Sequence, residues 1–240
     1  GLPAFLLGGD AFLEAFARDV AAAETSVMLQ AMTFQADRAG KAVFDCIASS
    51  KARERHVLID DYSSVVVSDA FAMGPRALTS PEFRKLVRET RLLPARFRAR
   101  NVSATITNPI AGRPWRYPAR NHKKMAVMDR RIVYLGGMNI SDHNFAWFDS
   151  MLRIESEQLG ALIANDMHET AAGRNRSMVA ELEDGRLYFF DGLKSRSLYR
   201  ELFSSIEKAQ VSVTILSPYV SEPLLSVIEQ RRNRDVPVTI

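Results

Sequence analysis

The sequence predicts an α/β fold, with helices and strands alternating along the chain. Apolar residues recur at helical spacing in several segments, and continuous apolar runs of strand length separate these segments. Such continuous runs are typical of strands buried on both faces of a sheet. With 47% apolar residues among 240, the chain can bury a proper core, as one large domain or one and a half ordinary ones.

The first helix and the first strand carry the clearest patterns. Phe12, Phe16 and Val20 stand four residues apart and predict a helix over 10–24 with one buried face. The continuous apolar segment 26–34 predicts a strand directly after it. The further expected elements are a helix over 41–54, a strand over 56–60, a helix over 81–91, a strand over 102–107, strands near 132–137 and 150–156, a helix near 159–172, and a hairpin over 178–190 that turns at Asp184 and Gly185.

Segment 108–120 interrupts this alternation. It holds three prolines, one glycine, two aromatic residues and three arginines, without helical or strand periodicity. We expect a long surface loop here that delivers the chain to His122.

The helix-then-strand pattern recurs near the C-terminal end. Residues 197–220 align with residues 11–34 at an offset of 186, and a helix over 221–232 and a strand over 236–240 are expected to follow. The alternative is that any α/β protein repeats helices and strands. The matched apolar positions are Phe12 with Leu198, Phe16 with Leu202, Val20 with Ile206, Ala23 with Ala209, and Val27 with Val213.

An internal repeat would divide the chain into two domains. We expect a first domain over 1–190 and the truncated beginning of a second over 191–240, which stops at Ile240 as its second strand forms.

One dense cluster of reactive side chains lies in the first domain. His122, Lys124 and Asp129 are spaced as His-x-Lys-x-x-x-x-Asp, and the segment GGMN that follows ends at Asn139. A shuffled chain of this composition would contain the three-residue pattern only about 0.007 times. Chance is therefore a poor explanation for this cluster.

These residue types suit the cleavage of a phosphodiester. The substrate is an anion, so its oxygens need fixed positive charge and donors, which Lys124 and Asn139 supply. The neutral imidazole of His122 is an uncharged nucleophile, and a hydrogen-bonded carboxylate can fix its tautomer. No cluster of carboxylates, histidines and cysteines has metal-ligand spacing, so we expect no metal and no cofactor.

We expect the motif to lie on a strand. His122 and Lys124 then project from the same face, while Met125 and Val127 turn toward the core. Asp129 has the opposite parity but sits at the strand end, where a turn can redirect it.

The motif resembles that of the phospholipase D superfamily, whose signature is HxKxxxxD followed six residues later by GG or GS, any residue and Asn. His122, Lys124, Asp129 and Asn139 fit it, as do the two glycines between them. The segment SDHNFAWFDSMLRIES and the N-terminal pattern look like the bacterial cardiolipin synthase and phosphatidyltransferase branch.

The resemblance implies an α/β/α sandwich with a mixed sheet, here one complete half plus the truncated start of a second. It also implies a reaction through a phosphohistidine, without a metal. His122, Lys124 and Asp129 are then the catalytic candidates, with His122 as nucleophile or acid. Lys124 and Asn139 are the candidates for binding the substrate phosphate.

The expected function is that of a phosphodiesterase or phosphatidyltransferase acting on anionic phospholipid. The alternatives are a metal-independent nuclease, whose partner is nucleic acid, and a degenerate module that binds phosphate without catalysis. Because the motif occurs once, we expect its partner to be a missing second half of a longer chain or a second copy brought by dimerisation. The chain alone is expected to be inactive.

Composition adds two expectations. The net charge of +4 indicates a mild preference for anionic partners. No apolar run approaches the roughly 18–20 residues that cross a bilayer, so we expect a cytoplasmic protein or one peripheral at the membrane.

Overall fold

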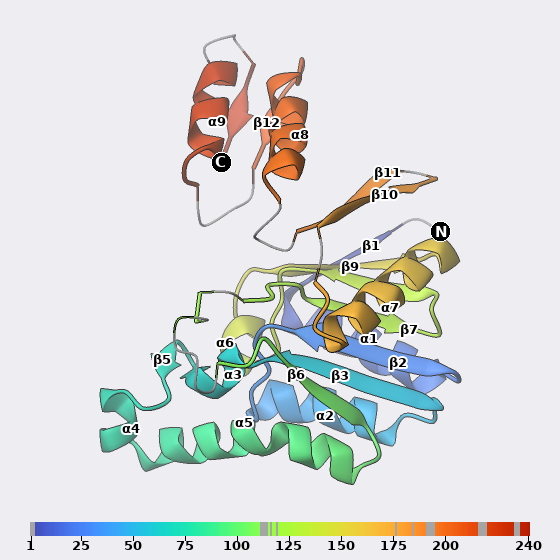
Figure 1. The fold of residues 1–240 in the computed structure, drawn as a ribbon, viewed down its shortest axis with the longest axis vertical. Coiled ribbons are helices and arrows are strands. Elements are labelled where there is room, and N and C mark those ends of the chain that lie inside the picture. The colour runs from blue at the N-terminus through green and yellow to red at the C-terminus, as the bar shows by residue number, and fades with distance from the viewer. Residues whose placement is uncertain are drawn as a thin grey trace. The chain divides into compact units, whose positions relative to one another are not determined.

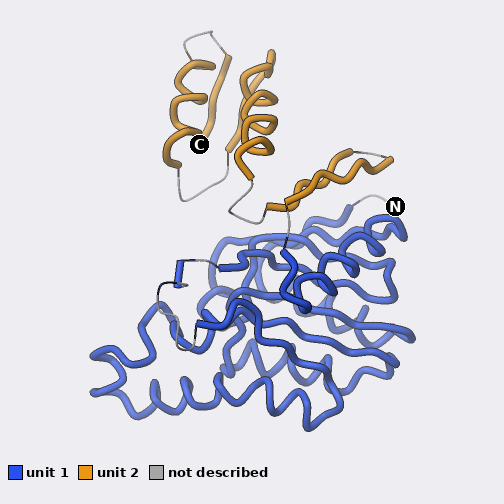
Figure 2. The backbone as a smooth tube through the Cα atoms, in the orientation of Figure 1, with its two compact units in different colours: residues 1–175 blue, residues 176–240 orange. Residues whose placement is uncertain are grey.

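The chain folds into two compact units, residues 1–175 and 176–240 (Figure 2). The computed structural model describes residues 3–110, 115, 117–118, 120–175, 177–183, 185–190, 195–215, 220–232 and 236–240.

A seven-stranded mixed sheet forms the centre of the first unit, in the order β1-β9-β8-β7-β2-β3-β6 (Figure 1). Strands β2, β3 and β6 run parallel, and each pair from β2 across to β1 is antiparallel. The strands are β1 Ala4–Leu7, β2 Ser26–Ala31, β3 Glu54–Asp60, β6 Ser103–Thr107, β7 Met125–Met128, β8 Ile132–Gly136 and β9 Ser150–Glu155.

Helices cover both faces of this sheet (Figure 1). Helices α1, α2 and α5 pack on one face, and α7 packs on the other against β7 and β8. This arrangement confirms the predicted α/β/α sandwich with a mixed sheet. The helices are α1 Gly8–Ala22, α2 Arg38–Ser49, α5 Pro81–Ala99 and α7 Glu157–Ala171, and the short elements are α3 Tyr62–Val65, β4 Val66–Val67, β5 Ala70–Phe71, α4 Pro75–Thr79 and α6 Asp142–Phe145.

Strand β2 shows why the sequence runs apolar without alternation. All six of its residues are buried. Val27 and Leu29 belong to the core that also contains Phe12 and Phe16 of α1, whereas Met28 is buried on the opposite face. A strand covered by helices on both faces has no solvent side, so its pattern cannot alternate.

Several helix ends differ from the predicted ones. Helix α2 begins at Arg38 because the Asp37 side chain caps it by accepting from the Gly40 N–H. It ends at Ser49, and β3 already begins at Glu54. Helix α5 continues to Ala99, beyond the predicted end at 91.

The second unit repeats the order helix, strand, helix, strand. Its strands β12 and β13 pair in parallel, as β2 and β3 do in the first unit. This agrees with the predicted internal repeat. The elements are the hairpin strands β10 Met178–Leu182 and β11 Gly185–Phe189, then α8 Arg196–Glu207, β12 Val213–Thr214, α9 Leu224–Arg232 and β13 Val238–Thr239.

The predicted hairpin over 178–190 is confirmed by the antiparallel pairing of β10 with β11. Asp184 of its expected turn lies outside the described residues, as do positions 111–114, 116 and 119 of the expected loop. The hairpin groups with the second unit, which starts at Arg176. The division into domains 1–190 and 191–240 stays a prediction.

Gly160 of α7 gives a sharp test of how this helix packs. Alanine inside a helix normally stabilises by about 1 kcal/mol over glycine. A Cβ at position 160 would lie 2.0 Å from the carbonyl oxygen of Arg130, in the turn after β7. We therefore expect Gly160→Ala to lower the free energy of unfolding by roughly 1–3 kcal/mol, measured by urea titration. A gain in stability would show that α7 does not pack directly on this turn.

Candidate functional site

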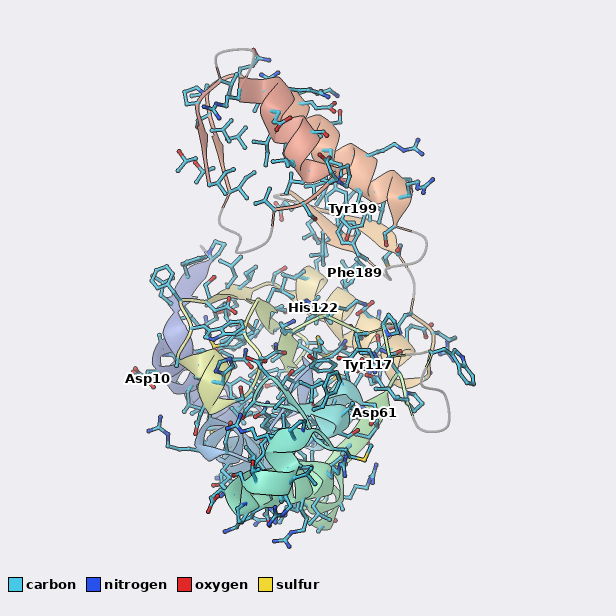
Figure 3. All side chains as sticks on the ribbon, turned by 90° about the vertical axis from the view of Figure 1, so that its left-hand side faces the viewer. Asp10, Asp61, Tyr117, His122, Phe189 and Tyr199 are labelled. Carbon is cyan, nitrogen blue, oxygen red and sulfur yellow. The ribbon has the colours of Figure 1, made fainter. Side chains whose placement is uncertain are left out.

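His122 and Lys124 lie just before β7, which begins at Met125. Figure 3 shows where His122 lies in the first unit. The expectation that both residues belong to a strand is therefore wrong. The ladder between β2 and β7 ends at the pair formed by Gln30 and Met125. A shared strand face thus does not bring the two side chains together. Instead they meet directly, because the Lys124 side chain folds back over His122.

The Lys124 ammonium makes two contacts with the same residue. Its Nζ lies 3.0 Å from Nδ1 of His122 and donates to the His122 carbonyl oxygen at 2.8 Å. A protonated lysine has hydrogens to donate and no acceptor, so Nδ1 is the acceptor in this contact. The proton of the neutral imidazole is then on Nε2.

Lys124 is a nearly buried cation, with 5% of its surface exposed. Burial lowers the pKa of Lys124 to about 8, and the negative charge of Asp149 acts in the opposite direction. At neutral pH most of the lysine is still protonated. The site therefore holds a fixed positive charge that its surroundings only partly compensate.

Asp149 is a site residue that the sequence pattern did not identify. A Cβ at Gly137 would lie 2.3 Å from its Oδ1, so the second glycine of the GG pair leaves the space that this carboxylate occupies. The Ser150 N–H donates to the same oxygen at 2.7 Å. Gly137 is the sequence feature that could have pointed to this carboxylate, because a glycine beside a motif allows another group to approach the backbone closely.

The imidazole of His122 is held neutral. The residue is exposed, yet protein crowds the ring, and this crowding together with the charge of Lys124 lowers the pKa of His122. Asp60 acts in the opposite direction. A lowered pKa leaves more of the imidazole unprotonated at pH 7, as a nucleophile or a general base requires.

Asp60, at the end of β3, organises the chain that leads to His122. Its side chain is 1% exposed. It accepts from Nη1 of Arg120 at 2.7 Å and from the Asn121 N–H at 2.9 Å. It also accepts from Nδ2 of Asn108 at 2.8 Å. One buried carboxylate thereby ties both ends of the predicted loop over 108–120 to the sheet.

The residue after His122 is anchored as well. Lys123 donates to both carboxylate oxygens of Asp166, on α7, at 2.7 Å. Its backbone N–H donates to the Asn121 side chain at 3.1 Å. Both neighbours of His122 are thus fixed by buried or nearly buried polar groups, while the imidazole itself stays accessible.

Asn139 lies at the same end of the sheet as Lys124, where β2 and β8 end and β7 begins. Its Oδ1 accepts from the Thr33 N–H at 3.0 Å. A bridge between Phe34 and Ile140 secures the same segment. Because Oδ1 faces Thr33, the NH2 group of this amide points away from Thr33. A donor to a phosphate needs this orientation.

Asp129 lies at the opposite end of β7. The turn does redirect its side chain, but toward the start of β2. There it accepts from the N–H groups of Glu24, Thr25 and Ser26 and from the Thr25 hydroxyl, at 2.8–3.0 Å. Its hydrogen-bond partners are thus residues 24–26, at the end of the strand far from His122. Asp129 fixes the β7–β8 turn, and its catalytic assignment stays a prediction.

Two further properties concern the part of the chain that the structure describes. No group of three or more His, Cys, Asp or Glu side chains within it is placed to hold a metal ion. No helix among the same residues has both the length and the apolar character needed to cross a membrane.

A substitution at Asp129 separates its structural role from a catalytic one. Burial tends to raise the pKa of this carboxyl, but the donors of Glu24, Ser26 and Thr25 outweigh it, so the pKa is lowered. Its stabilising effect is therefore present at neutral pH and is lost as pH falls through the folded-state pKa. We expect Asp129→Ala to reduce stability by about 2 kcal/mol in urea unfolding at pH 7.

The matched control is Asp45→Ala, because this carboxylate is exposed on α2. We expect it to leave stability almost unchanged. Folded Asp129→Ala should bind dimethyl phosphate like the parent chain, as measured by NMR titration. A tenfold loss of that affinity in a folded variant would assign Asp129 to the phosphate site instead.

Sequence comparison links the chain to cardiolipin synthases. No family model matches it. The minor cardiolipin synthase ClsB of Bacillus subtilis is 29% identical over 138 residues, which cover 50% of this chain and 34% of that protein. Cardiolipin synthase B of Salmonella typhimurium is 30% identical over 138 residues, covering 57% of this chain and 29% of that protein. The chain thus spans about a third of the length of these curated relatives.

Two solved structures share the fold of this chain. Phosphatidylserine synthase of Haemophilus influenzae superposes with a TM-score of 0.65 at 15% identity, over 98% of this chain and 60% of that one. NucT from Helicobacter pylori superposes with a TM-score of 0.50 at 13% identity, over 71% of this chain and 96% of that one. The motif, the fold and the relatives agree: the chain is similar to bacterial cardiolipin synthases, and its motif resembles that of the phospholipase D superfamily.

Proposed function

We propose that this chain supplies one side of a phosphodiester-cleaving site in a phosphatidyltransferase of the cardiolipin synthase type, acting on anionic phospholipid. The observation that carries the proposal is the contact between the buried Lys124 ammonium and the His122 imidazole. It places a fixed cation within one hydrogen-bond length of a neutral nitrogen base. The cardiolipin synthases among the relatives support the choice of substrate class.

The proposed reaction has two displacements at phosphorus. In the first, an imidazole nitrogen attacks phosphorus and the P–O bond to the first alcohol breaks, while a second imidazole gives that alcohol its proton. In the second, another alcohol loses its proton to that second imidazole, attacks phosphorus and displaces the first imidazole. Lys124 and Asn139 hold the phosphate oxygens throughout.

His122 can take either of the two imidazole roles. As the acid, His122 would act as the imidazolium: it takes up a second proton on Nδ1 once Lys124 turns to the phosphate, gives its Nε2 proton to the leaving alcohol and becomes neutral. A bound phosphate would compete for the same ammonium, and Nδ1 could then carry the proton while Nε2 attacks. The second imidazole comes from a second half or a second copy, which is the partner expected from the sequence.

The first test uses the full reading frame that encodes this chain. We expect it to convert phosphatidylglycerol to cardiolipin or phosphatidic acid in the presence of chelator, and His122→Ala to abolish the conversion by at least about 1000-fold. His168→Ala is the matched control, because His168 is an exposed histidine on α7. Metal-independent nicking of DNA with no lipid product would replace the proposal with the nuclease alternative.

A trapping experiment identifies the role of His122. If it is the nucleophile, acid-labile phosphate from labelled substrate should become attached to it, and His122→Ala should remove the label. Turnover retained by that variant would exclude His122 from the mechanism altogether.

The pKa shifts predict how phosphate binding depends on pH. Lys124 must be protonated to hold the anion, and its pKa of about 8 means that it loses this charge as pH rises through that value. We expect the affinity of the chain for dimethyl phosphate, an anion of constant charge in this range, to fall above pH 8. Lys124→Arg should move that fall to higher pH, whereas an unchanged profile would show that another group controls binding.

A further inference from the structure

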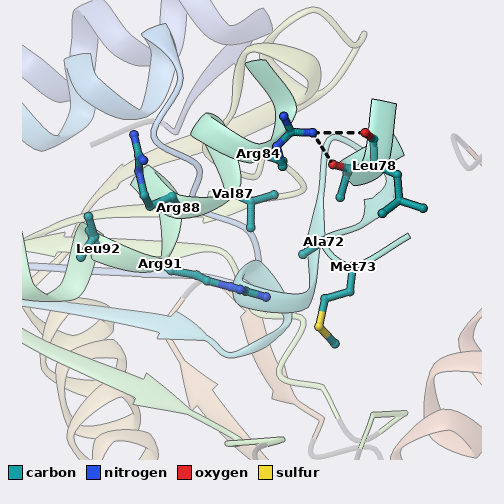
Figure 4. Close-up of a pocket in the computed structure, with 9 residues that line it drawn as sticks. Ala72, Met73, Leu78, Arg84, Val87, Arg88, Arg91 and Leu92 are labelled. Carbon is teal, nitrogen blue, oxygen red and sulfur yellow. Dashed lines mark hydrogen bonds between the residues drawn. The ribbon is translucent and has the colours of Figure 1, made fainter. Parts of the chain in front are cut away.

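A groove of about 520 Å³ lies beside α5, away from the residues around His122 (Figure 4). One wall is a single stripe of α5 that includes Arg84, Arg88 and Arg91, at the helical spacing of four and three residues. The other wall comes from Ala72, Met73, Ala77 and Leu78, of which the last two belong to α4. We call the exposed part of this region the basic tip: Met73, Leu78, Arg84, Arg88 and Arg91.

Positive charge is concentrated in this region. Residues 71–100 contain eight arginines and lysines against two glutamates, a net charge of +6, whereas the whole chain has a net charge of +4. The remainder of the chain is therefore slightly acidic. Any long-range attraction of an anionic partner is directed to this part of the surface.

The arginines of the tip are little neutralised by acidic side chains. Arg84 donates to the carbonyl oxygens of Ala77 and Leu78 at 2.8 and 3.3 Å. Arg91 donates to the carbonyl oxygen of Ser64 at 3.0 Å. These contacts orient the guanidinium groups without cancelling their charge.

Arg88 has only a long contact with a carboxylate. It lies 4.0 Å from Glu89, and that glutamate also pairs with Arg96. An exposed pair at this distance contributes little, so the charge of Arg88 remains effective at the surface.

Apolar side chains stand out next to this charge. Met73 is 88% exposed and Leu78 is 82% exposed. Beneath them, Val67, Ala72 and Phe83 form part of a separate small core that anchors the segment. The two exposed side chains are thus presented on a supported structure.

We propose that the basic tip docks the chain on the surface of an anionic lipid bilayer. The arginines would contact lipid phosphates, and Met73 and Leu78 would enter the boundary between head groups and acyl chains. The charge complementarity selects an anionic partner. The two protruding apolar side chains favour a bilayer over nucleic acid, which offers phosphates but no layer to receive them.

The proposal concerns binding and does not depend on the chemistry proposed for His122. His122→Ala should bind vesicles like the parent chain even where it abolishes turnover. A failure of docking and a failure of the proposed reaction are therefore distinguishable.

The test is sedimentation of the chain with vesicles of phosphatidylglycerol and phosphatidylcholine in equal amounts, compared with vesicles of phosphatidylcholine alone. We expect binding to the anionic vesicles only, and a decline with added salt. Replacing Arg84, Arg88 and Arg91 together by glutamine should weaken binding about 100-fold, at roughly fivefold for each charge.

Two further variants complete the test. Met73→Ser with Leu78→Ser should weaken binding about 10-fold with the charge unchanged, and folding should be intact because both side chains are exposed. A control that replaces Lys41, Lys51 and Arg53 by glutamine removes the same charge from other exposed positions and should have little effect.

Equal loss in the control and in the arginine variant would overturn the proposal, because binding would then follow only net charge. Equal binding to both kinds of vesicle would also overturn it. A parent chain that ignores vesicles but binds DNA would replace the bilayer with nucleic acid as the partner.

Discussion

The buried carboxylate of Asp60 is the constraint on which the site depends most. Taking a charge out of water is costly unless donors surround it, and here Arg120, Asn121 and Asn108 supply them. Loss of the carboxylate would remove its ion pair with the nearly buried Arg120 guanidinium. The segment that enters the site forms few hydrogen bonds of the sheet itself. Its position therefore follows from the Asp60 carboxylate.

A second carboxylate fixes the other end of the same strand. Strand β7 has only four residues, and Asp129 at its far end binds three successive backbone N–H groups at the start of β2. The HxKxxxxD motif therefore extends along the whole of β7, from the end that Asp60 fixes to the end that Asp129 fixes. The side chains of His122 and Lys124 meet at one end of this strand, while Asp129 fixes the turn at its other end.

The sequence predicts those parts whose signal is local. The pattern of Phe12 and Phe16 identifies α1, and the unbroken apolar run identifies β2, because both elements are long and bury a complete face. The short elements β4, β5 and α4, which have two to five residues, carry no periodicity that the sequence analysis could use, and it did not predict them. The start of β7 was misplaced because ladder pairing, and not residue type, decides where a strand begins.

In the site, too, residues with a local sequence signal were predicted, and residues placed by distant contacts were not. Spacing alone found His122, Lys124 and Asn139, which the structure places at one end of the sheet. The roles of Asp60 and Asp149 depend on contacts with residues far away in sequence, or on the space left by Gly137, and only the folded chain reveals them. Asp60 and Asp61 were visible as the end of a strand, but nothing local distinguishes an organising carboxylate from a solvated one.

The charge of the site follows from the contact between its two bases. Lys124 and His122 cannot readily both be protonated, because each cation disfavours the other across 3.0 Å and burial adds to the cost. Near neutral pH the pair therefore carries one positive charge, on the lysine. A phosphodiester carries one negative charge, so it compensates the buried ammonium without requiring the imidazole to ionise. Under the proposed function, the pair would therefore bind the substrate phosphate and keep a neutral histidine ready to react.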